Sequence, residues 1–112
     1  MKQERTDFLG EFEQMVLMAV LRLGDEAYAV PIREEIERRT GRAVSRGAIY
    51  ITLDRLEKKG YLESWLADAT PERGGRAKRY QKVSVAGAVA LKRSRAALEK
   101  MWQGLEPVIR KI

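Results

Sequence analysis

The chain has 112 residues, of which 22 are Lys or Arg and 16 are Asp or Glu, and it contains no His and no Cys. This length fits one domain, or one domain with an extension. The missing residue types exclude thiolate nucleophiles, disulfides, thiolate or imidazole metal sites and His-based catalytic triads. We therefore expect no metal and no cofactor. No apolar run is long enough to cross a membrane, so we expect no membrane partner and a cytoplasmic location.

Charge is distributed unevenly along the chain. Residues 1–40 carry 6 basic and 9 acidic side chains, a net charge of −3, whereas residues 41–112 carry 16 basic and 7 acidic ones, a net charge of +9. The densest basic stretch has five cations between Arg73 and Lys82, around the pair Gly74 and Gly75. Clustered positive charge attracts polyanions, and this clustering favours nucleic acid over a merely solubilising surface.

Two helices are predicted in the acidic part of the chain. Residues 11–23 carry apolar side chains at helical spacing and almost all round the helix, which predicts burial on most sides. A second helix is predicted over residues 31–40, because Pro31 is tolerated in a first turn and Gly41 ends the pattern. The inward side chains of this second helix are expected to be Ile32 and Ile36.

A third helix is predicted over residues 46–59, with Ser45 as its N-cap and Gly60 after its last turn. A short turn at residues 41–44 joins it to the second helix, as in a helix-turn-helix. The core stripe of the third helix comprises Ile49, Leu53 and Leu56. The opposite side of the helical wheel presents Gly47, Ile51, Asp54, Arg55 and Lys58.

A β-hairpin is predicted next. Residues 61–67 and 78–85 have strand character, and residues 68–76 between them are rich in turn-forming residue types. Side chains alternate between the two faces of a strand, which places Lys78 on one face and Arg79 on the other.

The rest of the chain is predicted to be a last helix, capped by Ser84 and weakened near Gly104 and Pro107. It carries a heptad-like apolar stripe. The elements before it already supply a core, so we expect this stripe to pair with a second copy of the chain. The expected dimer-interface residues are Leu91, Leu98, Met101, Trp102 and Leu105.

The predicted order of elements is mainly α with a small β-hairpin, which is the order of a winged helix-turn-helix. Within it, three motifs make the chain resemble the PadR-type transcriptional regulators over residues 10–91. The motifs are Glu26-Ala27-Tyr28, Ser45-x-Gly47-Ala48-x-Tyr50-x-x-Leu53-x-Arg55-Leu56 and Pro71-Glu72-Arg73-Gly74-Gly75-Arg76-x-Lys78-Arg79-Tyr80. We expect a winged helix-turn-helix DNA-binding domain over residues 1–85 and a dimerisation helix over residues 86–112. The resemblance, to the small members of the family, implies a homodimer joined through the last and first helices, usually a repressor.

The start of the third helix is one candidate DNA contact. Backbone N–H groups at Ser45, Arg46 and Gly47 can meet a phosphate, although an ordinary cap by Ser45 explains the sequence as well. Tyr50 can donate its hydroxyl to a phosphate, or it can pack beside the core. Arg55 can reach a phosphate or a base edge, or it can be a solvated helix charge.

The hairpin is the other candidate DNA contact, through Arg73, Gly74, Arg76, Lys78 and Arg79. Gly74 allows a tight tip, and the cations around it attract phosphates. Lys78 and Arg79 are expected on opposite faces, so only one of them is expected to join Arg73 and Arg76 on DNA. The sequence leaves open which one.

These features predict a sequence-specific DNA-binding transcriptional regulator that acts as a homodimeric repressor on a palindromic, double-stranded operator. No polar constellation typical of catalysis is visible, so we do not expect an enzyme. The alternative is a winged-helix adaptor whose basic wing meets an acidic protein. The resemblance also allows a planar small-molecule effector that stacks on Trp102 at the dimer interface.

Overall fold

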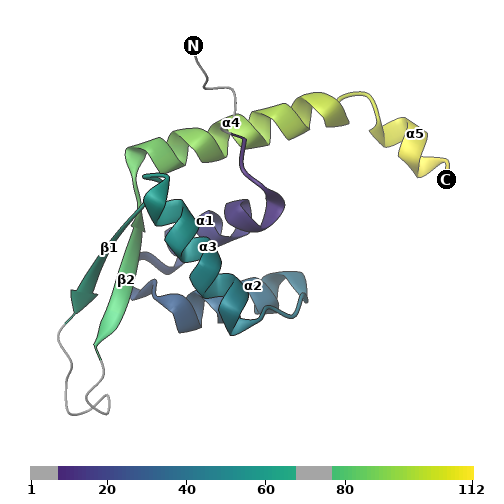
Figure 1. Cartoon of the computed structure of the whole chain (residues 1–112). Coiled ribbons are helices and arrows are strands. Elements are labelled where there is room, and N and C mark those ends of the chain that lie inside the picture. Colours follow the sequence, from purple (N-terminus) through teal and green to yellow (C-terminus); the bar gives the residue numbers. More distant parts are fainter. Residues whose placement is uncertain (1–7, 68–76) are drawn as a thin grey trace.

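Three helices, a hairpin, a long helix and a short helix follow one another in a computed structural model that describes residues 8–67 and 77–112 (Figure 1). The fold is mainly α with one small antiparallel hairpin, as the sequence predicts. The elements are α1 (Glu11–Leu23), the single-turn η2 (Gly24–Glu26), α2 (Ala29–Thr40), α3 (Arg46–Lys58), β1 (Leu62–Ala67), β2 (Lys78–Val83), α4 (Val85–Trp102) and α5 (Glu106–Arg110).

The core lies where α1, α2 and α3 meet. Val16 and Leu17 of α1, Ile32 of α2, and Ile49 and Leu56 of α3 are the largest fully buried side chains. The bounds predicted for the first helix are confirmed. Its predicted burial on most sides is confirmed, and the described residues leave only one apolar face of α1 without cover. That face carries the exposed Met18 and Leu21.

Helix α2 begins two residues before the predicted start. The Ile32 N–H donates to the Tyr28 carbonyl at 3.0 Å, so Pro31 still falls among the first-turn residues that need no N–H partner. Gly41 ends the helix in the left-handed region, with φ at 74°, as predicted.

Helix α3 follows its prediction closely. The Ser45 hydroxyl accepts from the Ala48 N–H at 3.0 Å, which confirms Ser45 as the N-cap. Gly60 follows the last turn with φ at 81°. The predicted core stripe of Ile49, Leu53 and Leu56 is buried, and the side chains opposite it are exposed.

The hairpin pairs Leu62 with Val83 at its base and Ala67 with Lys78 at the last described pair. The Gln81 N–H donates to the Ala27 carbonyl at 2.8 Å, so β2 is also fastened to the chain segment before α2. The second strand ends at Val83, two residues before its prediction, because Ser84 already caps the next helix.

Helix α4 is anchored at its start and projects at its end (Figure 1). The Ser84 hydroxyl accepts from the Gly87 N–H at 3.0 Å, and the Ser94 hydroxyl accepts from the Leu9 N–H at 2.8 Å. The helix stops at Trp102, and Gly104, with φ at 79°, turns the chain into α5, which confirms the predicted break. Across residues 8–67 and 77–112, no helix combines the length and the apolar character needed to cross a membrane.

Candidate nucleic-acid interface

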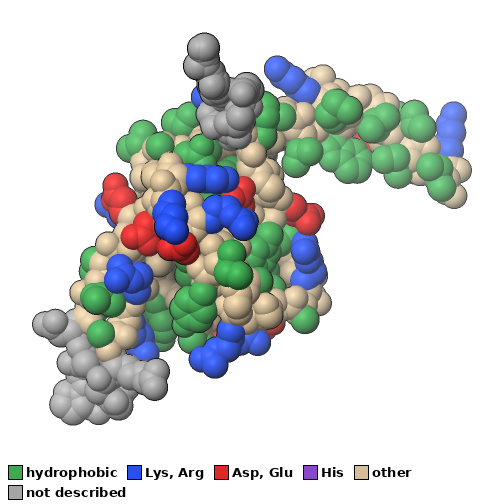
Figure 2. All heavy atoms as spheres, viewed as in Figure 1, with side chains coloured by type: hydrophobic (Ala, Val, Ile, Leu, Met, Phe, Trp, Pro, Cys, Tyr) green, Lys and Arg blue, Asp and Glu red, His purple; other side chains and the backbone are tan. Residues whose placement is uncertain are grey.

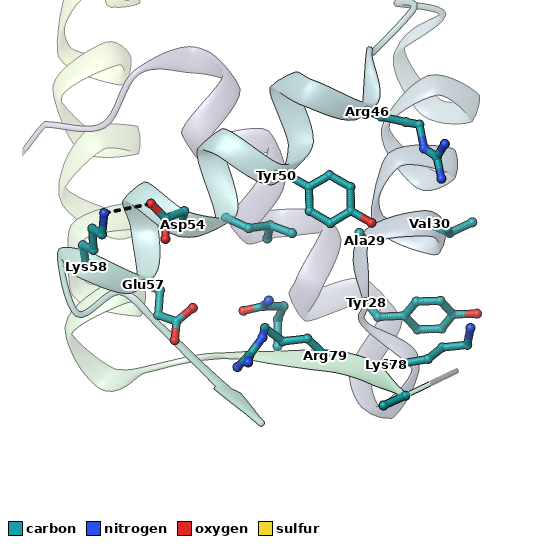
Figure 3. Close-up of a pocket in the computed structure, with 13 residues that line it drawn as sticks. Tyr28, Ala29, Val30, Arg46, Tyr50, Asp54, Glu57, Lys58, Lys78 and Arg79 are labelled. Carbon is teal, nitrogen blue, oxygen red and sulfur yellow. Dashed lines mark ion pairs between the residues drawn. The ribbon is translucent and has the colours of Figure 1, made fainter. Parts of the chain in front are cut away.

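A groove of about 830 Å³ lies between α3, strand β2 and the start of α2 (Figure 3). Helix α3 forms one wall with Arg46, Tyr50, Leu53, Asp54, Glu57 and Lys58. Strand β2 and the residue before it form the second wall with Ala77, Lys78, Arg79 and Gln81. The third side consists of Tyr28, Ala29 and Val30. We call this feature the groove.

Four cations and two carboxylates line the groove, and they differ in whether they have partners. Lys58 Nζ lies 3.0 Å from Asp54 Oδ2, so these two charges offset each other. Arg79 donates to the Ser64 hydroxyl at 3.0 Å, and that hydroxyl donates to Glu57 at 2.7 Å. The positive charge of Arg79 is therefore linked to the negative charge of Glu57 through one bridging side chain.

Arg46 and Lys78 are the lining cations without such a partner. Neither makes an ion pair with any residue in the described parts of the chain. Instead, Lys78 Nζ lies 5.0 Å from the centre of the Tyr28 ring. In Figure 3, Lys78 points toward Tyr28 on the side of the groove where Arg46 lies, and Arg79 points the other way, toward Glu57. The two side chains point in different directions, as strand alternation predicts, but both line the same groove.

Tyr50 lies one helical turn after Arg46 and is 55% exposed. Its hydroxyl points toward the start of α2, where Val30 is also exposed (Figure 3). Tyr50 is therefore at most partly packed beside the core, and its contact with DNA stays a prediction. An exposed phenol beside an unpaired guanidinium presents a donor and a positive charge on the same surface.

The groove brings together four of the residues that the sequence predicts for DNA binding: Arg46, Tyr50, Lys78 and Arg79. Ser45 and Gly47 flank Arg46 at the start of α3. A side chain built at Gly47 would meet no atom within 4 Å, so the packing of this chain does not require a glycine there. Three predicted wing residues lie outside the described residues: Arg73, Gly74 and Arg76.

Arg55 does not line the groove. Its charge acts instead on Glu13, a buried carboxylate near the start of α1. Burial raises the pKa of Glu13, but the Gly10 N–H, the Lys59 ammonium and the charge of Arg55 together bring that pKa below its ordinary value. Lys59 Nζ lies 2.9 Å from the Glu13 carboxylate.

The sequence does not single out Tyr28 or Gln81 as parts of this surface. Tyr28 precedes α2 and reaches the groove only because the hairpin folds back against it. Gln81 is 3% exposed, and its side-chain oxygen accepts no hydrogen bond from the rest of the described chain. Both positions depend on contacts between segments about 50 residues apart, and no local pattern reports such contacts.

Apolar side chains gather along the projecting arm formed by the end of α4 and α5 (Figure 2). Met101 is 73% exposed and Trp102 is 55% exposed, and Leu98 and Leu105 are also exposed. Leu91, in contrast, is partly buried against the core of its own chain. A second hollow of about 420 Å³ lies between α1 and α4, lined largely by apolar side chains that include Phe8, Met15, Met18, Ala97 and Leu98.

Metal-ligating side chains do not gather in the described part of the chain: no three or more Asp, Glu, His or Cys residues there could hold a metal ion.

The model of the transcriptional regulator PadR-like family matches residues 17–93 of this chain. A solved transcriptional regulator from Clostridium thermocellum is 22% identical with a TM-score of 0.69, covering 89% of this chain and 90% of its own. A PadR-like transcriptional regulator from Bacillus cereus is 19% identical with a TM-score of 0.64, covering 89% and 88%. A PadR family transcriptional regulator from Eggerthella lenta is 19% identical with a TM-score of 0.67, covering 88% and 86%. Among proteins of curated function, none is similar enough to count as a match.

Proposed function

This chain belongs to the PadR-like family of transcriptional regulators, and from that premise we propose that it binds a specific double-stranded DNA operator through the groove and represses transcription as a homodimer. The observation that carries the proposal is that Arg46 and Lys78, on two walls of one groove, lack ion-pair partners within the described chain. Two cations that line one groove and have no ion-pair partner in the described chain can bind successive phosphates of a nucleic acid.

In this proposal α3 enters the major groove, where its first residues reach the DNA. Arg46 binds a phosphate or the edge of a guanine, and Tyr50 donates to a phosphate. The backbone N–H groups after Ser45 add the favourable end of the helix dipole. Gly47 leaves room for close approach of the duplex. Arg55, on the exposed side of α3 outside the groove, contacts DNA only if the bound duplex extends beyond the groove.

Of the two neighbouring cations on β2, Lys78 and Arg79, we assign DNA contact to Lys78. Arg79 is already hydrogen-bonded to Ser64, whereas among the described residues Lys78 contacts the Tyr28 ring and has no ion-pair partner. Arg73, Gly74 and Arg76 would extend the contact to the next stretch of DNA backbone. Each phosphate that a cation neutralises adds about 0.9 to the slope of log affinity against log salt.

The homodimer is the second part of the proposal. Exposed apolar side chains on the arm, with Met101 and Trp102 among them, need another surface. A second copy supplies it by two-fold symmetry, with Leu91, Leu98 and Leu105 continuing the contact. The operator is then palindromic, with half-sites about one helical turn apart. An effector stacking on Trp102 would act at this interface.

The two carboxylates in the groove support binding rather than a reaction. Asp54 is paired with Lys58, and Glu57 accepts from Ser64. Both carboxylates are thus engaged by neighbouring side chains, and we expect neither of them to act on a substrate.

Fluorescence anisotropy with the duplex upstream of the chain's own gene, repeated over a range of salt, tests the proposal. Wild type should bind, and Arg46→Ala and Lys78→Ala should each weaken binding and lower the salt slope by about 0.9. Lys58→Ala is the matched control, since Lys58 is already paired with Asp54, and it should change the slope less. No binding at low salt would overturn the DNA proposal and favour the adaptor alternative.

A further inference from the structure

Three aromatic rings join the segment before α2 to the hairpin. The centres of the Tyr28 and Tyr80 rings lie 5.4 Å apart with an edge-on angle of 69°. Tyr80 also stacks on Trp65 of the other strand, at 6.1 Å and 22°. These distances are typical of favourable aromatic pairs. The rings therefore fix the lateral position of the hairpin relative to α2.

A backbone hydrogen bond fastens the same two segments. The Gln81 N–H donates to the Ala27 carbonyl at 2.8 Å, one residue from Tyr28 on one segment and one from Tyr80 on the other. Tyr28 thus lies at a joint with two independent attachments, one through rings and one through backbone. Removing the ring leaves the backbone attachment in place.

The Lys78 side chain lies over the face of the Tyr28 ring. Its ammonium lies 5.0 Å from the centre of the Tyr28 ring, within the range of a cation–π contact. Lys78 belongs to the last described strand pair, opposite Ala67. A lysine at that place without a ring beneath it would sample many rotamers, and ordering it on DNA would cost entropy.

We propose that Tyr28 is a positioning residue that acts on DNA through Lys78. The ring holds the Lys78 ammonium on the Arg46 side of the groove before DNA arrives, so that both cations are in place together. The Tyr28 hydroxyl is not needed for this, because a cation–π contact uses the face of the ring. This inference rests on the DNA-binding function proposed above.

The test compares four variants on the same duplex over a range of salt. Tyr28→Ala should weaken binding roughly tenfold and lower the salt slope by about 0.9, as Lys78→Ala does. The double variant should bind no more weakly than Lys78→Ala alone, because the two residues form one unit. Tyr28→Phe keeps the ring face and should restore wild-type affinity and slope.

Lys82→Ala is the matched control for charge. Lys82 lies on the same strand but does not line the groove. Combining it with Tyr28→Ala should give additive losses. Additive losses for Tyr28→Ala with Lys78→Ala would overturn the inference, as would an unchanged slope in Tyr28→Ala. If Tyr28→Phe bound as weakly as Tyr28→Ala, the hydroxyl would be a direct contact and the proposed role would be wrong.

A measurement without DNA separates this inference from the proposed function. Protons beside the Lys78 ammonium should show an upfield ring-current shift in NMR spectra, kept in Tyr28→Phe and lost in Tyr28→Ala. Tyr28→Leu, which keeps apolar bulk without a ring face, should lose the shift even if Tyr28→Ala fails to fold. Absence of the shift in wild type would overturn the inference. Its presence in a protein that binds no duplex would overturn the DNA proposal and leave Tyr28 as the residue that places Lys78.

Discussion

The two halves of α4 differ in what covers them. The part up to Ser94, which we call the covered half, buries Gly87, Ala90 and Ser94 against the rest of the chain, while Val85 and Val89 on its outer side are exposed. The second half leaves Met101 and Trp102 exposed, although it is as rich in large apolar side chains. One continuous helix therefore contains a part that the same chain covers and a part that none of the described residues covers. The comparison teaches that an apolar stripe predicts burial but does not say which chain provides the cover.

Gly87→Ala tests the packing of the covered half of α4 most directly. A methyl group at Gly87 would lie 2.3 Å from the Tyr61 carbonyl oxygen. This oxygen belongs to the backbone, so a rotamer change cannot relieve the clash. We expect a loss of about 3 kcal/mol in the free energy of unfolding, measured by urea denaturation, because overpacking forces backbone shifts. Gly47→Ala is the matched control, since nothing lies within 4 Å there, and it should stabilise by about 0.5–1 kcal/mol. Equal effects at both glycines would contradict the tight packing of α4.

Ser94→Ala removes the next attachment of the covered half. The Leu9 N–H would lose its acceptor at a buried position, and an unpaired buried donor costs about 1–3 kcal/mol. Urea denaturation should show a loss of about 2 kcal/mol. Arg95→Ala, next to it on the helix, breaks only the exposed pair with Glu99 and should cost under about 0.5 kcal/mol. A loss for Ser94→Ala no larger than that for Arg95→Ala would show that the hydrogen bond does not hold α4.

Local sequence signals account for much of this fold. Caps and stops at Ser45, Gly41 and Ser84 set helix ends because each acts within one turn of its own backbone. The early start of α2 escaped the prediction because the Tyr28 carbonyl accepts the first hydrogen bond of the helix, whereas a helix that began at Pro31 would use the Val30 carbonyl.

The candidate site was predicted less completely than the fold. Arg46, Tyr50, Lys78 and Arg79 follow from charge, helical wheel and strand alternation, and they do meet in one groove. Which of these cations lacks a partner among residues 8–67 and 77–112 does not follow, because it depends on the hydrogen bond from Arg79 to Ser64 across two strands. Arg55 is also exposed on α3 but lies outside the groove, because it is turned away from the stripe that includes its neighbours Asp54 and Glu57 and acts on Glu13 instead.

Lowering the pH should weaken the attachment of the covered half of α4, because Glu13 becomes protonated. Glu13 accepts from the Gly10 N–H at 2.9 Å, next to the Leu9 that binds Ser94. Its folded pKa lies below the ordinary value, so its contribution to stability is complete above that ordinary value and is lost as the pH falls through the folded pKa. Glu13→Gln should cost about 1 kcal/mol at neutral pH and reduce the acid loss seen in urea denaturation.

Glu35→Gln provides the comparison for this pH series. The hydrogen bond from Arg39, together with Arg38, holds the pKa of Glu35 below its ordinary value, but Glu35 lies on α2 away from the anchor of α4. Both variants should therefore flatten the dependence of stability on pH. Only Glu13→Gln should also speed hydrogen exchange at the Leu9 amide, and a matching increase in Glu35→Gln would contradict the proposed link to α4.

Truncation after Ala97 should have the smallest effect on the stability of a single chain and the largest on its assembly. It keeps Gly87 and Ser94 and removes Leu98 with all of the exposed arm. At dilutions where both proteins are monomers, the free energies of unfolding should agree within about 0.5 kcal/mol, since the deleted side chains are exposed. At higher concentration, light scattering should give the mass of one chain for the truncated protein and of two for the wild type.

Met101→Asp separates loss of the arm from loss of its apolar face. It keeps the helix length and places a charge where a second copy would cover it, so it should also give the mass of one chain. If the truncated chain stays dimeric, the exposed face of α1, with Met18 and Leu21, is sufficient for pairing. The uncovered half of α4 would then need another partner. If truncation instead destabilises the monomer, the arm packs on its own chain in solution, and the contrast between the two halves of α4 does not hold.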